Sequence, residues 1–203
     1  HGWHGSAIRD FCGGTKLLFE LKYNVLIVDQ RGQWNSQGHT ISFGIKERFD
    51  VLSWINYVKE RFGNDVKISL YGVSMGSATV LMSTALNLPS NVKAIIADCP
   101  YTSGKDIIKK VCKNDMKLPY AVLKPFIFAS AFILAHFNLN DKNTYIPNAV
   151  KNTKVAILSL VSEEDSFVPC YMSKEIADAN QKYITRATFP NADHALSFMV
   201  DFE

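Results

Sequence analysis

One serine in this 203-residue sequence stands where a nucleophile could work. Ser74 lies between Gly72 and Gly76, directly after an apolar run and directly before a stretch of small and apolar residues typical of a helix. A sharp strand-to-helix turn strains the backbone of such a serine and exposes its hydroxyl, and it leaves no room for side chains two positions before and after. We therefore predict that Ser74 is a catalytic nucleophile; the alternative is a tight turn with a surface serine.

A serine hydroxyl needs a base to take its proton and an acid to orient that base. Asp165 and His194 follow Ser74 in the sequence, each on a loop after a segment that reads as a strand. Because the carboxyl ends of parallel strands share one edge of a sheet, both loops should lie beside Ser74. The sequence therefore predicts a catalytic triad of Ser74, Asp165 and His194.

Other carboxylates are candidates for the acid. Glu163, Glu164 and Asp193 could each be the acid or a solvated surface charge, and Asp98 ends the strand that follows Ser74. We favour Asp165 and keep Asp98 as the second choice. For the base there is less competition, because among the five histidines only His194 comes late in the chain after a terminal strand.

Acyl transfer also requires donors for the oxyanion that forms when a carbonyl is attacked. The backbone amide of Met75, directly after the nucleophile, is one candidate. The glycine-rich start of the chain, HGWHG, offers the amide of Trp3 as the other, with His1 orienting the loop. A disordered start is the alternative for this segment.

Strand-like and helix-like segments alternate along the chain. Short apolar runs predict strands at residues 24–29, 66–72, 92–99 and 155–161, with a less buried one at 184–189. Amphipathic segments between them predict helices at residues 8–22, 45–63, 77–87 and 171–183. Such alternation is typical of an α/β fold with an open, mostly parallel sheet and helices on both faces. We expect one domain over residues 1–203.

The helix predicted at residues 45–63 has an apolar stripe that includes Phe49, Ile55 and Tyr57. Its charged side chains, Glu47 among them, are expected to face water, and Gly63 is expected to end it.

No convincing strand occurs between residues 101 and 154. A charged helix at 105–113 and a long apolar one at 118–137 predict a helical cap inserted into the domain. Lys124, Pro125 and His136 interrupt the apolar run, whose unbroken part is shorter than the roughly 20 residues that a bilayer requires. We favour a cap or core helix; contact with a lipid-like substrate or a membrane is the second reading, and a membrane span is the third.

Charge and cysteines exclude some classes of protein. The net charge of +3 comes from 22 basic and 19 acidic residues without a basic stripe, so we expect no nucleic-acid partner. The four cysteines show no metal-ligand spacing, and we expect free buried thiols and no bound metal. These residues are Cys12, Cys99, Cys112 and Cys170.

The compartment stays open. The sequence has no glycosylation sequon and no signal peptide at its start, which favours the cytoplasm. The chain begins on HGWHGS without a preceding strand, so an upstream segment that anchors the protein to a membrane or exports it stays compatible with the sequence.

Four landmarks together resemble the α/β-hydrolase fold enzymes: HGW with the following HG, DQRGQWNSQG, GVSMG, and EEDSFVP with ADH. The likeness covers essentially the whole chain and is greatest to the bacterial serine-aminopeptidase-like or cinnamoyl-esterase-like group. It implies acylation of Ser74, proton transfer by His194, orientation by Asp165, and an oxyanion hole at Trp3 and Met75. Family members usually carry DxRGHGxS, where this chain has Gln33 and Trp34. They also have strands before the HG segment, so we expect that the N-terminal strands are missing.

The resemblance implies esterase-type chemistry, and a two-step acyl transfer calls for no cofactor. The aromatic residues would favour an apolar acyl or aryl group and no Arg or Lys is placed to bind a carboxylate or phosphate, so we expect small to medium esters as substrates. Trp34 and Phe126 are candidates to line an apolar substrate pocket. A peptidase, amidase or thioesterase is the alternative, since the triad does not choose the leaving group. A non-catalytic binding protein on the same fold is the third reading. Neither the physiological substrate nor the oligomeric state follows from the sequence.

Overall fold

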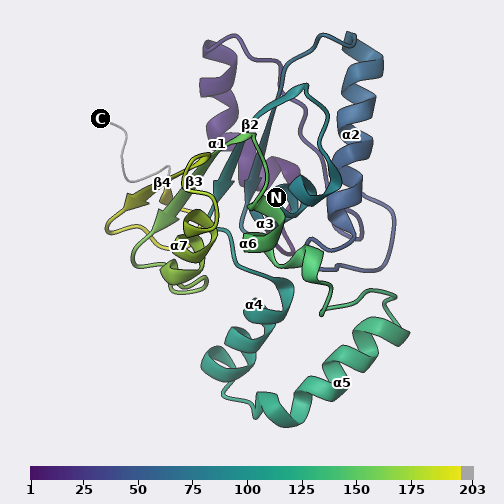
Figure 1. Ribbon diagram of the computed structural model, residues 1–203, viewed down its shortest axis with the longest axis vertical. Helices are drawn as coiled ribbons and strands as arrows, with labels where there is room; N and C mark the ends of the chain where they lie inside the picture. The colour runs from purple at the N-terminus through teal and green to yellow at the C-terminus, as the bar shows by residue number, and fades with distance from the viewer. Residues whose placement is uncertain (198–203) are drawn as a thin grey trace.

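A four-stranded parallel sheet organises the chain (Figure 1). The computed structural model describes residues 1–197. The strands lie in the order in which they occur in the sequence, and every neighbouring pair is parallel. They are β1 (Ile68–Val73), β2 (Val92–Asp98), β3 (Ala156–Ser162) and β4 (Ile184–Phe189). All four carboxyl ends therefore meet at one edge, and the predicted parallel α/β fold is confirmed.

Helices connect and cover the strands. α3 (Met75–Met82) packs on β1 and β2, α7 (Cys170–Asp178) packs on β3 and β4, and α6 (Ile146–Val150) contacts both α3 and α7. The other helices before β2 are α1 (Ala7–Glu20), α2 (Glu47–Phe62) and η1 (Ser83–Leu86). Ile95 of β2, Leu81 of α3 and Ile176 of α7 are fully buried. One apolar core between sheet and helices thus fixes the edge on which the candidate site lies.

The strand predicted at residues 24–29 is wrong. This segment is not assigned as strand and pairs with none of β1 to β4. Leu26 and Ile27 in it are 48% and 37% exposed. Apolar β-branched residues favour a strand, but a strand exists only where a neighbour completes its hydrogen bonds, and no part of residues 1–197 supplies one.

The burial predicted for α2 is partly wrong. Glu47, expected to face water, is buried, and its carboxylate accepts hydrogen bonds from the backbone amides of Ser42 and Gly44 at 2.8 and 3.0 Å. Phe49 and Tyr57 are 48% and 45% exposed instead. The buried carboxylate is stable here because it accepts hydrogen bonds from backbone amides in the turn that precedes α2.

A helical segment, which we call the inserted segment, lies between β2 and β3. It consists of α4 (Gly104–Lys110), the π-helix η2 (Val111–Asp115), α5 (Tyr120–Ile133), the short η3 (Lys142–Thr144) and α6 (Ile146–Val150). Figure 1 shows α4 and α5 extending away from the sheet. Arg48 of α2 holds this segment through Asp141 at 2.9 Å, and Lys46 donates to the carbonyl of Ala135 at 2.8 Å. Of the helices in residues 1–197, none has the length and apolar character needed to cross a bilayer.

Candidate active site

Ser74 occupies the turn between β1 and α3 in a strained conformation. Its φ is 53° and its ψ is −114°, a combination that residues with side chains rarely adopt. Its amide donates to the carbonyl of Asp98 at 2.9 Å, and its carbonyl accepts from the amide of Ala78 at 3.1 Å. These bonds to the next strand and to α3 hold the turn.

The two flanking glycines are needed for different reasons. A Cβ on Gly72 would lie 2.3 Å from the carbonyl oxygen of Gly76, inside the turn itself. A Cβ on Gly76 would lie 2.8 Å from the nitrogen of His1, so Gly76 admits the N-terminal loop. The glycine pattern therefore serves both the turn and the approach of residues 1–3 to Ser74.

We expect Gly72→Ala to reduce the free energy of unfolding by about 3 kcal/mol, near the upper end of overpacking effects, because the clash is with backbone atoms that cannot move aside. Gly14→Ala is the matched control: Gly14 lies within α1 with nothing within 4 Å of its Cβ position, and should gain about 0.5–1 kcal/mol from helix propensity. Urea denaturation of both variants measures the difference. Equal stabilities would contradict the packing argument.

The structure brings the three predicted triad residues into one hydrogen-bonded line. His194 Nε2 lies 2.9 Å from Ser74 Oγ, and His194 Nδ1 lies 2.7 Å from Asp165 Oδ2. With the proton on Nδ1, the imidazole donates to Asp165 and its Nε2 accepts from the Ser74 hydroxyl. The side chain of Asp165 is fully buried and that of His194 is 21% exposed. The distance between Ser74 Oγ and His194 Nε2 therefore allows direct proton transfer from the hydroxyl to the imidazole.

The loop after β3 fixes Asp165. Its second oxygen, Oδ1, accepts from the backbone amides of Phe167 at 2.9 Å and Val168 at 2.7 Å. The Phe167 ring lies 5.2 Å from the His194 ring, and Lys110 of α4 donates to the carbonyl of Ser166 at 3.1 Å. The inserted segment therefore touches the loop that carries the acid.

Asp193 ties the loop that contains Asp165 to the loop that contains His194. Its Oδ1 accepts from the amide and hydroxyl of Ser166 at 3.1 and 2.8 Å and from the amide of His194 at 2.7 Å. The amide of Ser166, with that of His194, lowers the pKa of Asp193. The sequence offered Asp193 as an alternative acid, whereas in the structure it braces the two loops that present Asp165 and His194.

Asp98, the second candidate acid, is fully buried at the end of β2. Its Oδ1 accepts from the Ser197 hydroxyl at 3.2 Å, and its Oδ2 has no hydrogen-bond partner within residues 1–197. Burial raises the pKa of Asp98 to about 6. His194 Nδ1 bonds Asp165 instead, so the geometry favours Asp165 as the orienting acid.

Asp98 should make stability depend on pH. Its pKa is about 6 in the folded chain against 3.8 for the free group, so the native state binds more protons between about pH 4 and 6. The free energy of unfolding therefore falls as pH rises through that window, by about 3 kcal/mol for this group. Asp98→Asn should remove this loss, so that it is more stable relative to the parent at pH 7 than at pH 4. Urea titrations at both pH values test this; a constant difference would contradict it.

Residues 1–3 lie against Ser74. A Cβ on Gly2 would be 3.5 Å from Ser74 Cβ and 4.0 Å from its Oγ. Within residues 1–197, neither the amide of Trp3 nor that of Met75 donates a hydrogen bond. Met75 is the first residue of α3, whose leading amides have no acceptor inside the helix. Both amides are therefore free to serve as oxyanion donors.

Three hydrogen bonds hold this N-terminal loop and a fourth anchors the Gln30 side chain; their partners Asp10, Gln30 and Thr79 were not indicated by the sequence. Asp10 of α1 accepts from the amide of Gly2 at 2.7 Å, and the amide of Gln30 donates to His1 Nε2 at 2.8 Å. The Gln30 side chain also donates to the His1 carbonyl and accepts from Thr79 of α3 at 3.2 Å. Gln30 stands in the DQRG motif, but nothing local indicated that its side chain would bridge two distant segments.

The two predicted substrate-binding residues are largely exposed to solvent. Trp34 and Phe126 are each 71% exposed. Trp34 lies in the loop before α2 with a φ of 46°, and Phe126 lies on α5. Their part in substrate binding stays a prediction.

Cys99, directly after β2, adjoins the triad. Its Sγ lies 3.8 Å from His194 Nε2, and Cys99, Asp165 and His194 offer possible ligand atoms within 4.8 Å of one another. Both imidazole nitrogens already have hydrogen-bond partners, and burial raises the pKa of the Cys99 thiol, which favours the neutral form. All four cysteines are free; Cys12 is exposed, contrary to the expected burial.

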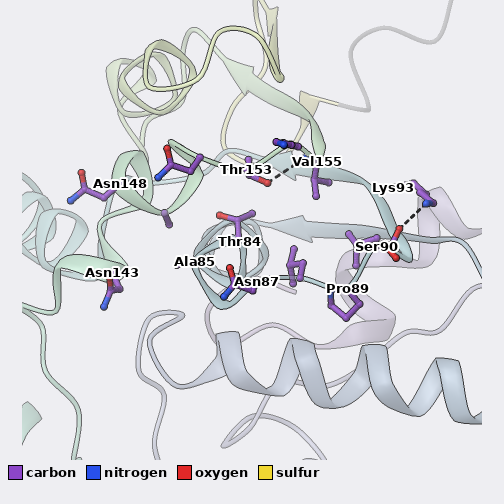
Figure 2. Close-up of a pocket in the computed structure, with 15 residues that line it drawn as sticks. Thr84, Ala85, Asn87, Pro89, Ser90, Lys93, Asn143, Asn148, Thr153 and Val155 are labelled. Atoms are coloured by element: carbon purple, nitrogen blue, oxygen red, sulfur yellow. Dashed lines mark hydrogen bonds between the residues drawn. The ribbon is translucent and has the colours of Figure 1, made fainter. Parts of the chain in front are cut away.

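Two hollows lie outside the triad. Figure 2 shows one of about 650 Å³ at the amino ends of β2 and β3, opposite the triad edge, lined by polar side chains that include Asn87, Asn148 and Thr153. The other, about 830 Å³, lies between α4 and the start of α7. No triad residue lines either one.

The chain belongs to the α/β-hydrolase fold family: its residues 1–145 match the family model described as "alpha/beta hydrolase fold". The uncharacterized protein YqkD of Bacillus subtilis is 23% identical over 182 residues, which are 90% of this chain and 59% of that protein. A lysophosphatidylserine lipase of Danio rerio, ABHD12, is 26% identical over 165 residues, which are 80% of this chain and 41% of that protein. The chain thus spans about half the length of these relatives.

Solved structures show the same fold. The esterase Pf2001 of Pyrococcus furiosus matches with a TM-score of 0.75 and 20% identity over 98% of this chain and 74% of that one. A monoacylglycerol lipase of Paleococcus ferrophilus matches with a TM-score of 0.65 and 19% identity over 96% and 83% of the two chains.

Proposed function

We propose that this protein is a serine hydrolase that cleaves carboxylic esters through an acyl-enzyme on Ser74. The observation that carries the proposal is the line of hydrogen bonds from Ser74 through His194 to Asp165, at 2.9 and 2.7 Å. A strained serine at a strand-to-helix turn, with a base in contact and a buried acid behind the base, is the arrangement that activates a hydroxyl for acyl transfer.

The first half of the reaction forms the acyl-enzyme. His194 Nε2 takes the Ser74 proton as Oγ bonds to the ester carbonyl carbon, whose oxygen becomes an oxyanion. The amides of Trp3 and Met75 donate to that oxyanion. The carbon–oxygen bond to the alcohol then breaks, and the alcohol leaves with the proton held by His194. Asp165 stabilises the imidazolium throughout.

The second half repeats these steps with water. His194 takes a proton from water as the oxygen attacks the acyl carbon, and returns it to Ser74 Oγ as the carboxylic acid leaves. No oxidant, metal or organic cofactor enters either half.

The names of the relatives support ester cleavage over amide cleavage. One solved relative is named an esterase, another a monoacylglycerol lipase, and one curated relative a lysophosphatidylserine lipase. The preference for small to medium acyl or aryl esters rests on the aromatic residues of the sequence, Trp34 and Phe126 among them, and is the finer part of the proposal.

Turnover of p-nitrophenyl esters of increasing acyl length, compared with aminoacyl p-nitroanilides, tests the proposal. We expect the esters to turn over with a preference for short to medium chains and the anilides to be poor substrates. Turnover of the anilides alone would overturn the ester assignment, and inactivity on both by the folded protein would overturn the enzyme assignment.

A further inference from the structure

The ammonium group of Lys110 lies inside the protein. Lys110 is the last residue of α4, and its side chain is 8% exposed. Its Nζ donates to the two carboxylate oxygens of Asp115 at 2.8 and 3.0 Å and to the carbonyl of Ser166 at 3.1 Å. It also lies 5.0 Å from the centre of the Phe167 ring. Lysine side chains are rarely buried unless they are paired, so these contacts decide where the ammonium lies.

The neighbouring lysines of the inserted segment behave differently. Lys105, Lys109 and Lys113 form no ion pair within residues 1–197, and the last two are exposed. Lys110 instead reaches a loop 56 residues farther along the chain. Its buried position is therefore particular to this residue and is not a general property of the charged helix.

The ion pair with Asp115 does not by itself account for this burial. Removing an ammonium from water costs about as much as a buried ion pair returns, and apolar side chains of similar size often replace such pairs without loss of stability. Asp115 lies in η2, in the same inserted segment as Lys110, and is 37% exposed. The contacts that leave this segment are those with the Ser166 carbonyl and the Phe167 ring.

The Ser166 carbonyl belongs to a peptide unit that binds the catalytic acid. The same unit, between Ser166 and Phe167, contains the Phe167 amide, which donates to Asp165 Oδ1 at 2.9 Å. Because a peptide unit is planar, a bond to its oxygen restrains the direction of its N–H. An ammonium on the oxygen also polarises the unit and strengthens the N–H as a donor. Lys110 and Asp165 thus hold opposite ends of one planar group.

The loop around Ser166 is restrained from two directions. The amide and hydroxyl of Ser166 donate to Asp193 Oδ1 at 3.1 and 2.8 Å, on the side of the His194 loop. Its carbonyl accepts from Lys110 on the side of the inserted segment, and among residues 1–197 it has no other donor. Removal of the ammonium would therefore free this carbonyl, and with it the orientation of the peptide unit.

A continuous series of hydrogen bonds runs from the inserted segment to Ser74. It passes from Lys110 Nζ through the peptide unit to Asp165, with distances of 3.1 and 2.9 Å. It continues from Asp165 through His194 to Ser74 Oγ, with distances of 2.7 and 2.9 Å. Lys110 is the first member of this series and comes from a different part of the fold than the triad.

We propose that Lys110 is a positioning residue for the triad. It fixes the peptide unit that holds Asp165, and so couples the placement of the inserted segment to the placement of the catalytic acid. The inference deepens the proposed ester hydrolysis and rests on it for its effect on rate. It requires no contact between Lys110 and substrate, so its loss should act on kcat and leave KM nearly unchanged.

Lys110→Met tests the proposal, because methionine keeps most of the length and volume without the charge. We expect kcat for a water-soluble p-nitrophenyl ester to fall by about 10- to 100-fold, the effect of a small misplacement in a catalytic site. KM should stay within about twofold of the parent. The midpoint of thermal unfolding should stay near the parental value, since apolar replacement of a buried lysine costs little stability.

Three further variants at and beside this position complete the series. Lys110→Arg should recover most of the activity, because a guanidinium also donates to a carboxylate and a carbonyl. Lys110→Gln keeps a neutral donor and should lose about three- to tenfold in kcat; it replaces the methionine variant if that protein does not fold. The matched control Lys109→Met removes an exposed lysine from the same helix and should keep the parental kcat.

Asp115→Asn separates positioning from ion pairing. It removes the ion pair but leaves the Lys110 ammonium able to donate to the Ser166 carbonyl. We expect kcat to stay within about threefold of the parent, because most of the positioning contact remains. A loss equal to that of Lys110→Met would assign the effect to the ion pair within the inserted segment and overturn the proposal.

The proton on His194 Nδ1 gives a readout that requires no catalysis. Its downfield NMR resonance reports the hydrogen bond to Asp165. Lys110→Met should shift this resonance or broaden it through faster exchange with water, whereas Lys109→Met should leave it unchanged. A parent that hydrolyses no ester while Lys110→Met still changes the resonance would overturn the proposed function and retain the positioning role. A folded Lys110→Met protein with an unchanged resonance would overturn the inference, whatever its kcat.

Discussion

Ser74→Ala is expected to lower kcat for ester hydrolysis by about 10⁴- to 10⁶-fold, the range found when the nucleophile of a serine hydrolase is removed. Without Oγ no acyl-enzyme forms, although His194 and Asp165 keep their hydrogen bond. Substrate still binds, so the loss should fall on kcat more than on KM. Initial rates with a p-nitrophenyl ester measure it.

A second serine of the same helical region supplies the control. Ser83 is buried in η1 and donates to the carbonyl of Val80 at 2.7 Å, with no contact to the triad. Ser83→Ala should keep its activity, and a fluorophosphonate probe should label the parent and Ser83→Ala but not Ser74→Ala. A folded Ser74→Ala protein that retains more than about a tenth of the parental kcat would contradict the nucleophile assignment.

Because the backbone of Ser74 is strained, substitutions at this position should affect the free energy of unfolding and the catalytic activity differently. Alanine keeps the unfavourable φ of 53°, whereas glycine adopts it freely. Ser74→Gly should therefore be inactive and yet more stable than Ser74→Ala by about 1 kcal/mol or more in urea denaturation. Equal stabilities would mean that the turn stores little strain.

The sequence could indicate the triad because each part depends on short-range pattern and simple topology. The glycines around Ser74 reflect a local turn, and both loops with Asp165 and His194 follow apolar strands of one parallel sheet. Parallel strands bring their carboxyl ends to one edge whatever the details of packing. The strands β1 to β3 were predictable because they are short and mostly apolar, whereas β4, which contains Thr185 and Arg186, was predicted as a less buried strand.

Other features depended on contacts between distant residues and could not be read locally. Residues 24–29 have the composition of a strand, but no segment of residues 1–197 pairs with them. The contacts of Asp10 with Gly2 and of Gln30 with His1 and Thr79 exist only after folding. Amphipathic pattern likewise assigned Glu47 to solvent, although its carboxylate has backbone amides to accept from.

The same distinction bears on the choice of acid, because Asp165 and Asp98 both lie at strand ends. The structure separates them by partner. Asp165 accepts from His194 Nδ1 and two backbone amides, whereas Asp98 accepts from Ser197 and has an oxygen without a partner among the described residues. An acid that orients the base must accept a hydrogen bond from the Nδ1 proton of the histidine. In the structure Asp165 is the carboxylate in hydrogen-bond contact with His194 Nδ1.

Asp165→Asn is therefore expected to reduce kcat by about 10⁴-fold, because the amide can donate to Nδ1 and so stabilise the tautomer that cannot accept the serine proton. Asp98→Asn should keep kcat within about tenfold of the parent, since it has no bond to the imidazole. Initial rates of both variants across pH 5–9 distinguish the two effects, and thermal unfolding verifies that each is folded. If Asp98→Asn shows the greater loss, the role of orienting acid passes to Asp98 and the observed bond between His194 and Asp165 is not the productive one.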